Sequence, residues 1–163
     1  MIAFSPRNAL FFTNFAPMNM TVISPATFEA GHYEAVCRLL RQLTTRDVAL
    51  SREAYEQLVC SPSSKLFLML GGDEAVMGML TVGMYASPTG TKAWIEDVVV
   101  EATLRGGGLG RALVEHAIAY CREVGIDTMY LTSNPKRVAA NALYQSVGFG
   151  RKETNMYKMD LKQ

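Results

Sequence analysis

The 163-residue chain has little net charge, few histidines and few cysteines, and each shortage excludes a class of function. Lysine and arginine total 16 against 15 aspartate and glutamate residues, so the net charge of +1 gives no broad field for nucleic acid or an anionic membrane. The two histidines, His32 and His116, have no neighbouring set of ligands, and no metal site is expected. His116 continues the apolar face of a predicted helix, which indicates a packed structural histidine.

The cysteines Cys37, Cys60 and Cys121 are odd in number and form no C-x-x-C pair, so we expect buried free thiols in a reducing compartment. No apolar run approaches the ~18 residues of a membrane span. Residues 1–19 lack the basic start and clean apolar core of a signal peptide. They are interpreted either as lying upstream of a natural start or as an arm that packs on its own domain or on a neighbour. In the last case the protein would be a homodimer, which stays a possibility. A cytoplasmic protein is predicted, with residues 20–163 as one domain.

Hydrophobic periodicity predicts an α/β domain built on a mixed sheet. Strands are expected over 20–24, 65–70, 75–85, 93–100, 128–132 and 157–161, and helices over 27–43, 51–60, 108–124 and 136–147. Thr27 and Ser51 are the predicted N-caps of the first two helices. Strand 128–132 should run parallel to strand 93–100, which reads as buried on both faces, because a helix connects them by a right-handed crossover.

A glycine-rich segment separates strand 93–100 from the next helix. It consists of Arg105, Gly106, Gly107, Gly108, Leu109, Gly110 and Arg111. A helix start gathers unpaired N–H groups at the positive end of the helix dipole, and the missing Cβ atoms let a phosphate approach the backbone. The segment therefore predicts an anion site; a flexible β–α connection is the alternative.

The spacing of these glycines excludes two common nucleotide loops. A dinucleotide fingerprint that starts at Gly106 or Gly108 needs glycine where Arg111 or Leu113 stands. A P-loop that starts at Gly106 also needs glycine at Arg111. Neither nucleotide-binding fold fits the sequence.

The spacing that does fit is R-x-x-G-x-G, from Arg105 to Gly110. With W-I-E-D-V-V-V before it and A-A-N-A-L-Y-Q-S-V-G-F after it, the chain resembles the GCN5-related N-acetyltransferase (GNAT) family over residues 94–149. The resemblance is softer over 20–93 and does not cover 1–19. It implies the GNAT fold, acetyl-CoA as co-substrate with its pyrophosphate at this loop, and transfer of the acetyl group to a primary amine.

Acyl transfer from a thioester to an amine needs an acid for the departing thiolate. In the family, the tyrosine of L-Y-x-x-x-G-F sits beside the CoA sulfur, and the stretch from Leu143 to Phe149 matches this motif position for position. The resemblance therefore makes Tyr144 the catalytic acid; a helix residue that only packs under the sheet is the alternative.

Glu96 and Asp97 are charges inside an otherwise apolar strand, which is costly unless they line a cavity or are paired. Strand alternation predicts that they point to opposite faces. A desolvated carboxyl has a raised pKa, which suits a base acting on an ammonium substrate. Glu96 resembles the family acid of this strand, so it is predicted to be catalytic or to orient substrate, with a structural ion pair as the alternative. Asp97 is the weaker candidate.

The resemblance also assigns contacts with the pantetheine arm to the backbone of Val98, Val99 and Val100, and further cofactor contacts to Asn134 and Asn141. The chain departs from the family pattern seven residues before the tyrosine. Asparagine is frequent there, whereas this chain has Arg137, so Asn141 or Arg137 is the predicted substitute.

No well-placed cysteine or serine suggests a covalent route, so direct attack by the amine in a ternary complex is expected. The acceptor side is assigned to residues 28–55 and 85–92. A closed pocket there would favour a small amine, and an open acidic groove would favour a peptide. A catalytically silent CoA-binding regulatory module is a third interpretation.

Overall fold

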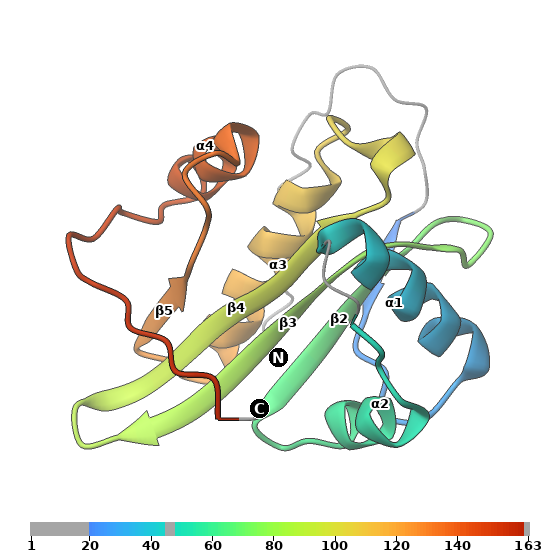
Figure 1. The fold of residues 1–163 in the computed structure, drawn as a ribbon, viewed down its shortest axis with the longest axis horizontal. Helices are drawn as coiled ribbons and strands as arrows, with labels where there is room; N and C mark the ends of the chain where they lie inside the picture. Colours follow the sequence, from blue (N-terminus) through green and yellow to red (C-terminus); the bar gives the residue numbers. More distant parts are fainter. Residues whose placement is uncertain (1–19, 45–47, 162–163) are drawn as a thin grey trace, which may run out of the picture.

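Five strands pair in chain order to form a mixed sheet in a computed structural model that describes residues 20–44 and 48–161 (Figure 1). They are β1 (Thr21–Ile23), β2 (Ser64–Leu70), β3 (Val76–Ser87), β4 (Gly90–Val100) and β5 (Thr128–Leu131). The first four strands are antiparallel, and β5 runs parallel to β4. The predicted mixed sheet and its parallel pair are confirmed.

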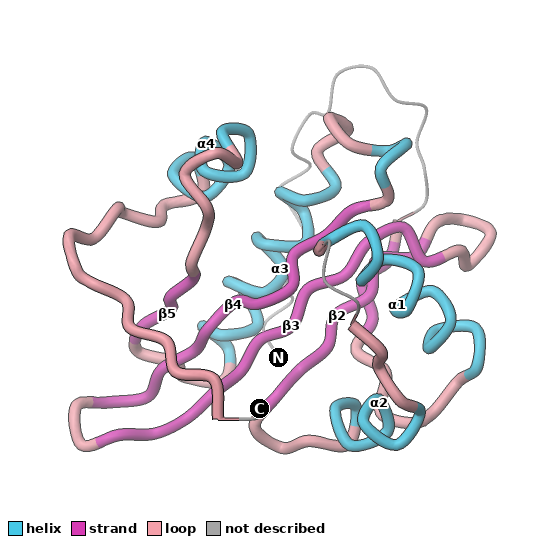
Figure 2. The backbone as a smooth tube through the Cα atoms, in the orientation of Figure 1, coloured by secondary structure: helices cyan, strands magenta, loops and turns pink. Residues whose placement is uncertain are grey.

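The helices lie on both faces of this sheet (Figures 1 and 2). They are α1 (Ala30–Leu43), α2 (Arg52–Val59), α3 (Leu109–Glu123) and α4 (Val138–Ser146), with a short 3-10 turn over Ala102–Leu104. Alternate residues of β2 supply two separate cores: Phe67 packs on the α3 side, whereas Leu66 and Leu68 pack on the side of α1 and α2. Because both faces are covered, β2 is apolar along nearly its whole length.

The helix starts were predicted with mixed success. Ser51 is the N-cap of α2, where its Oγ accepts a hydrogen bond from the N–H of Ala54 at 3.1 Å. The prediction for Thr27 is wrong, because α1 begins at Ala30 with Glu29 as its N-cap and no side-chain capping bond. Threonine is a preferred cap but does not by itself fix where a helix begins.

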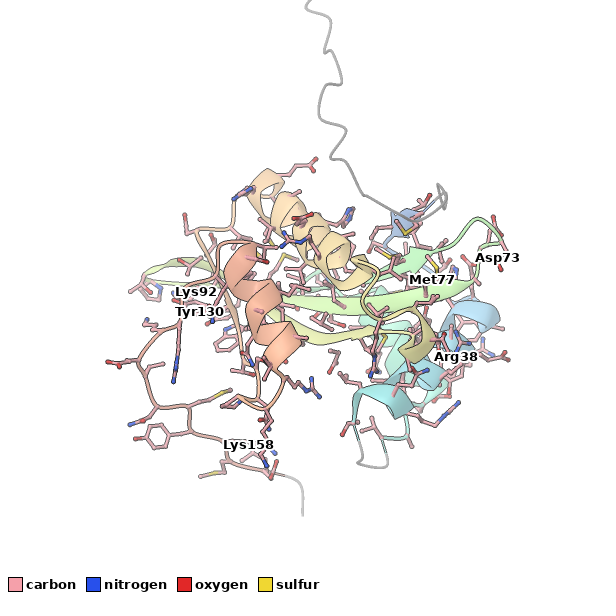
Figure 3. The ribbon with its side chains drawn as sticks, turned by 90° about the horizontal axis from the view of Figure 1, so that it is seen from above. Arg38, Asp73, Met77, Lys92, Tyr130 and Lys158 are labelled. Atoms are coloured by element: carbon pink, nitrogen blue, oxygen red, sulfur yellow. The ribbon has the colours of Figure 1, made fainter. Side chains whose placement is uncertain are left out.

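The predicted strand over residues 157–161 is also wrong, since residues 149–161 adopt no regular structure. Its alternating apolar side chains are exposed: Tyr157 by 87%, Met159 by 80% and Leu161 by 88%. Figure 3 shows the segment around Lys158 well apart from Tyr130 of β5. A strand needs a partner for its backbone as well as an alternating pattern, and no described strand pairs with residues 157–161.

The predictions for the histidine on α3 and for the three cysteines are confirmed in part. His116 packs edge-on against Phe67 with ring centroids 4.9 Å apart, and burial lowers its pKa, which confirms a packed histidine. All three cysteines are free; Cys121 is buried and Cys37 half-buried, but Cys60 is exposed, contrary to prediction. Among the residues described here, no helix is long and apolar enough to cross a membrane. The predicted arm, residues 1–19, lies outside the described residues.

Candidate active site

A β-bulge in β4 shapes the candidate site. Thr81 of β3 pairs with Glu96, and Met79 pairs with Val99, so β4 uses one more residue than β3 over this interval. Asp97 has a φ of +53°, a left-handed conformation that is uncommon outside glycine. The bulge interrupts the alternation of side chains, and Glu96 and Asp97 line the same cavity. The prediction of a strand buried on both faces is wrong, because Glu96 and Asp97 are exposed on β4.

The cavity opens where β4 and β5 separate. Their pairing ends at Ile95 and Leu131, and β4 continues past this point to Val100 without a partner on that side. The cavity has a volume of about 550 Å³. Its lining residues come from the α1 end, β4, β5 and α4: Leu40, Leu43, Thr44, Val48, Ile95, Glu96, Asp97, Val98, Leu131, Thr132, Arg137 and Tyr144.

The cavity includes residues from one of the two segments that the sequence analysis assigned to the acceptor side. Leu40, Leu43 and Val48 fall in the predicted segment 28–55 and line the cavity, whereas no residue of 85–92 does. The second segment forms the end of the β3–β4 hairpin, which lies away from the cavity. Apolar helix periodicity indicates a core face equally well, so nothing in the sequence marked Leu40 and Leu43 as cavity residues.

Both carboxyls of the bulge have raised pKa values. Both residues are exposed at the mouth of the cavity, so only part of each side chain loses water; for Glu96 this partial desolvation is the main cause, and the neighbouring charge of Asp97 adds to it. For Asp97 the cause is desolvation. Within residues 20–44 and 48–161 neither carboxyl has a hydrogen bond or ion pair. The alternative of a structural ion pair therefore lacks a basic partner among these residues.

Tyr144 reaches the same cavity from α4. Burial raises the pKa of its phenol, and the positive charge of Arg137 acts in the opposite direction. The phenol is therefore protonated near neutral pH and can donate its proton. Its ring also packs edge-on against Phe149 at a centroid distance of 6.3 Å, so the residue has a packing role as well.

The glycine-rich segment leads directly into α3. Gly106 and Gly108 have φ values of +86° and +81°, and Gly108 is the N-cap of α3. The N–H of Ala112 makes the first helical bond, to the Gly108 carbonyl at 3.0 Å, which leaves the preceding amides without a partner inside the helix. A Cβ on Gly106 would meet nothing within 4 Å, so there is open space beside this backbone.

The other residues of this segment have contacts of their own. Arg105 donates through Nε to the Val100 carbonyl at 3.3 Å, and Arg111 forms an ion pair with Glu115 at 3.0 Å. A Cβ on Gly110 would lie 3.5 Å from Leu143, in ordinary contact, so this glycine lies against α4. Both guanidinium groups thus already have protein partners, whereas the backbone amides before Ala112 have none inside the helix.

Asn134 and Asn141 stabilise the loop before α4. The Asn141 side-chain amide donates to the carbonyls of Asn134 and Arg137, both at 2.9 Å, and Asn134 Oδ1 accepts from the N–H of Lys136 at 2.9 Å. These bonds fix the position of Arg137. Its Nη2 in turn donates to the Leu43 carbonyl at 3.1 Å, a contact between α1 and the start of α4 that sequence reasoning missed.

Comparison with known protein families identifies the class to which this chain belongs. The sequence profile of the acetyltransferase (GNAT) family matches residues 33–149, and the chain belongs to this family. The family uses acetyl-CoA as co-substrate. Among the described residues no group of three or more His, Cys, Asp or Glu side chains could hold a metal ion.

Two acetyltransferases are similar to this chain in sequence over part of their length. A mycothiol acetyltransferase of Renibacterium salmoninarum is 36% identical over 51% of this chain and 26% of its own length. A [ribosomal protein bS18]-alanine N-acetyltransferase of Escherichia coli is 38% identical over 36% of this chain and 39% of its own. The chain thus spans less than half the length of these relatives.

A solved aminoglycoside acetyltransferase from an uncultured soil metagenomic sample has a TM-score of 0.76 at 16% identity, covering 88% of this chain and 97% of that one. At this identity the likeness supports the GNAT fold alone.

Proposed function

We propose that this protein is an acetyl-CoA-dependent N-acetyltransferase that acts on a primary amine of a small molecule. The observation that carries the proposal is that the Glu96 carboxyl and the Tyr144 phenol line one cavity from different elements, β4 and α4. Its volume of about 550 Å³ falls within the range typical of small-molecule pockets. The likeness to a mycothiol acetyltransferase supports a small acceptor.

Acetyl-CoA fits the residues around this cavity. The open space beside Gly106 and the free amides at the start of α3 suit a pyrophosphate. The backbone of Val98, Val99 and Val100, on the unpaired side of β4, is the proposed contact for the pantetheine arm, with Arg105 and Arg111 supplying positive charge. Asn134 and Asn141 would contribute mainly by holding the loop before α4. Acetyl-CoA supplies the thioester.

The proposed chemistry is a direct transfer in a ternary complex. Glu96, directly or through water, accepts a proton from the amine, whose nitrogen forms a bond to the thioester carbon. The carbon–sulfur bond breaks, and Tyr144 donates its proton to the departing sulfur. Exchange with solvent returns both side chains to their starting states. The raised pKa of Glu96 makes it a stronger base than a glutamate with the ordinary pKa.

The test is thiol release from acetyl-CoA in the presence of a panel of small amines, with the acetylated products identified by mass spectrometry. Peptides with a free N-terminus form a second arm, because a relative named for acetylating a ribosomal protein alanine makes protein acceptors the second candidate. Binding of CoA without thiol release in any arm would instead favour a silent regulatory module.

We also propose a cytoplasmic location and leave a homodimer as a further proposal. The three free cysteines support a reducing compartment. Cell fractionation and light scattering of the purified chain test the two statements.

Gly106→Ala is expected to weaken CoA binding by about tenfold or more, since a methyl group would occupy the space proposed for a phosphate near backbone donors. Gly125→Ala is the matched control, because Gly125 has a similar φ of +78° and equally open surroundings at the far end of α3. Both variants should lose about 1–2 kcal/mol of stability from the left-handed backbone. Calorimetric titration with CoA checks the difference; equal affinities for the two folded variants would place the phosphates elsewhere.

A further inference from the structure

Three of the cavity-lining side chains carry charge, and they lie on two elements. Glu96 and Asp97 project from the bulge of β4, and Arg137 lies at the start of α4. Although all three line one cavity, Arg137 forms no ion pair with either carboxyl or with any other acid among the described residues. The cavity thus presents acidic groups and a basic group as separate features.

Arg137 is held in place with most of its donors unused by the described contacts. Its Nη2 donates to the backbone carbonyl of Leu43 at 3.1 Å, at the C-terminal end of α1. A guanidinium has five N–H donors in a planar fork, and this neutral carbonyl engages one side of it. A carboxylate is a stronger partner for the fork than a backbone carbonyl, because charge-assisted pairs can form two parallel bonds.

The second carboxyl of the bulge needs an explanation as well. One base is enough for the proposed chemistry, yet Asp97 stands beside Glu96 at a left-handed backbone position, where glycine or asparagine would fit as well without adding a negative charge. Two neighbouring carboxylates repel each other unless a cation lies between or beside them. An ammonium group of the acceptor would supply that cation.

We propose that the acceptor is an aminocarboxylate, a molecule that carries a carboxylate as well as its primary amine, as amino acids do. Arg137 binds the carboxylate, and Asp97 attracts the ammonium group to Glu96. This inference rests on the proposed N-acetyltransferase function and names the class of its substrate. A diamine or polyamine would satisfy the two carboxyls but would place a further positive charge in a cavity that already contains Arg137.

The inference is tested with matched acceptors that differ only in the carboxylate, such as phenylalanine against phenethylamine and 5-aminopentanoate against pentylamine. At saturating acetyl-CoA, kcat/KM should be roughly 10- to 100-fold higher for the aminocarboxylate, the size of a charge-assisted interaction. Arg137→Ala should reduce this ratio to near one, and Arg137→Lys should give an intermediate ratio. Lys136→Ala is the matched control, because it removes a neighbouring charge that does not line the cavity, and it should keep the wild-type ratio.

Each other outcome overturns the inference in a distinct way. A wild-type enzyme that prefers carboxylate-free amines or diamines rejects the substrate class and leaves the proposed N-acetyltransferase function intact. Equal losses for both members of a pair in Arg137→Ala and Arg137→Lys, with unchanged melting temperatures, would assign Arg137 to acetyl-CoA. Absence of thiol release with every amine, while CoA still binds, removes the proposed function and this inference with it.

Discussion

Tyr144→Phe is expected to lower kcat by roughly 10²- to 10⁴-fold, the usual contribution of a general acid. The substitution removes only the hydroxyl, so the ring keeps its edge-on contact with Phe149 and α4 stays packed on the core around α3. The loss should appear in kcat more than in the KM for acetyl-CoA, because proton donation to the departing sulfur strengthens only in the transition state. Steady-state kinetics and calorimetric titration with CoA separate these two effects.

Tyr120→Phe provides the control for this result. Tyr120 is a partly buried tyrosine on α3 that packs against Phe67 at a centroid distance of 5.2 Å and does not line the cavity. Removal of its hydroxyl tests whether any buried phenol matters for turnover, and we expect activity within about threefold of wild type. If Tyr144→Phe also stays within that range, Tyr144 is a packing residue and another group must assist the leaving sulfur.

The order and type of most secondary-structure elements could be predicted from the sequence, because helix starts, helix ends and apolar faces are encoded by residues close together in the chain. The glycine turn at Gly108, the stop at Gly125 and the apolar face of the intervening helix each depend on residues close together in the chain. The positions of β4, α3 and β5 follow, and so does their parallel crossover. Tyr144 was identified for a different reason, since only the family resemblance distinguished it from an ordinary packed helix residue.

The bulge at Asp97 could not be predicted in this way. The stretch from Trp94 to Val100 reads as an uninterrupted strand, and strand alternation alone separates Glu96 from Asp97. Their shared cavity results from a one-residue slip against β3, and register is set by pairing across the sheet as well as by the strand's own sequence. The sequence thus marked the two acids, whereas the bulge that holds them at one cavity becomes visible only in the folded sheet.

Contacts between distant segments were equally hidden. The bond from Arg137 to the Leu43 carbonyl joins residues 94 positions apart, and no periodic pattern encodes such a pair. Asn141, for which a cofactor contact stays a prediction, uses its side-chain amide to hold the loop that carries Arg137. The sequence marked these residues as candidates, while the partners of each side chain depended on tertiary packing.

Glu96→Gln is expected to lower kcat/KM by roughly 10²- to 10⁴-fold, the range of a general base, and to change the pH dependence of the reaction. A base acts in its deprotonated form, so wild-type kcat/KM should rise with pH through the pKa of Glu96. Desolvation, followed by the charge of Asp97, raises that pKa, which places this acid limb above the ordinary glutamate range. A glutamine amide cannot titrate, so the Glu96→Gln variant should lose this limb and retain only the one that belongs to the acceptor amine.

Asp97→Asn tests more specifically whether the acid limb belongs to Glu96. Because the charge of Asp97 is the second cause of the raised Glu96 pKa, its removal should shift the acid limb toward lower pH. Desolvation is the larger cause and persists in the variant, so the limb should stay above the ordinary glutamate range. A pH profile of kcat/KM with one amine, measured for the wild type, Asp97→Asn and Glu96→Gln, checks both shifts. An acid limb that persists unchanged in Glu96→Gln would show that another group is the base and that Glu96 only orients the substrate.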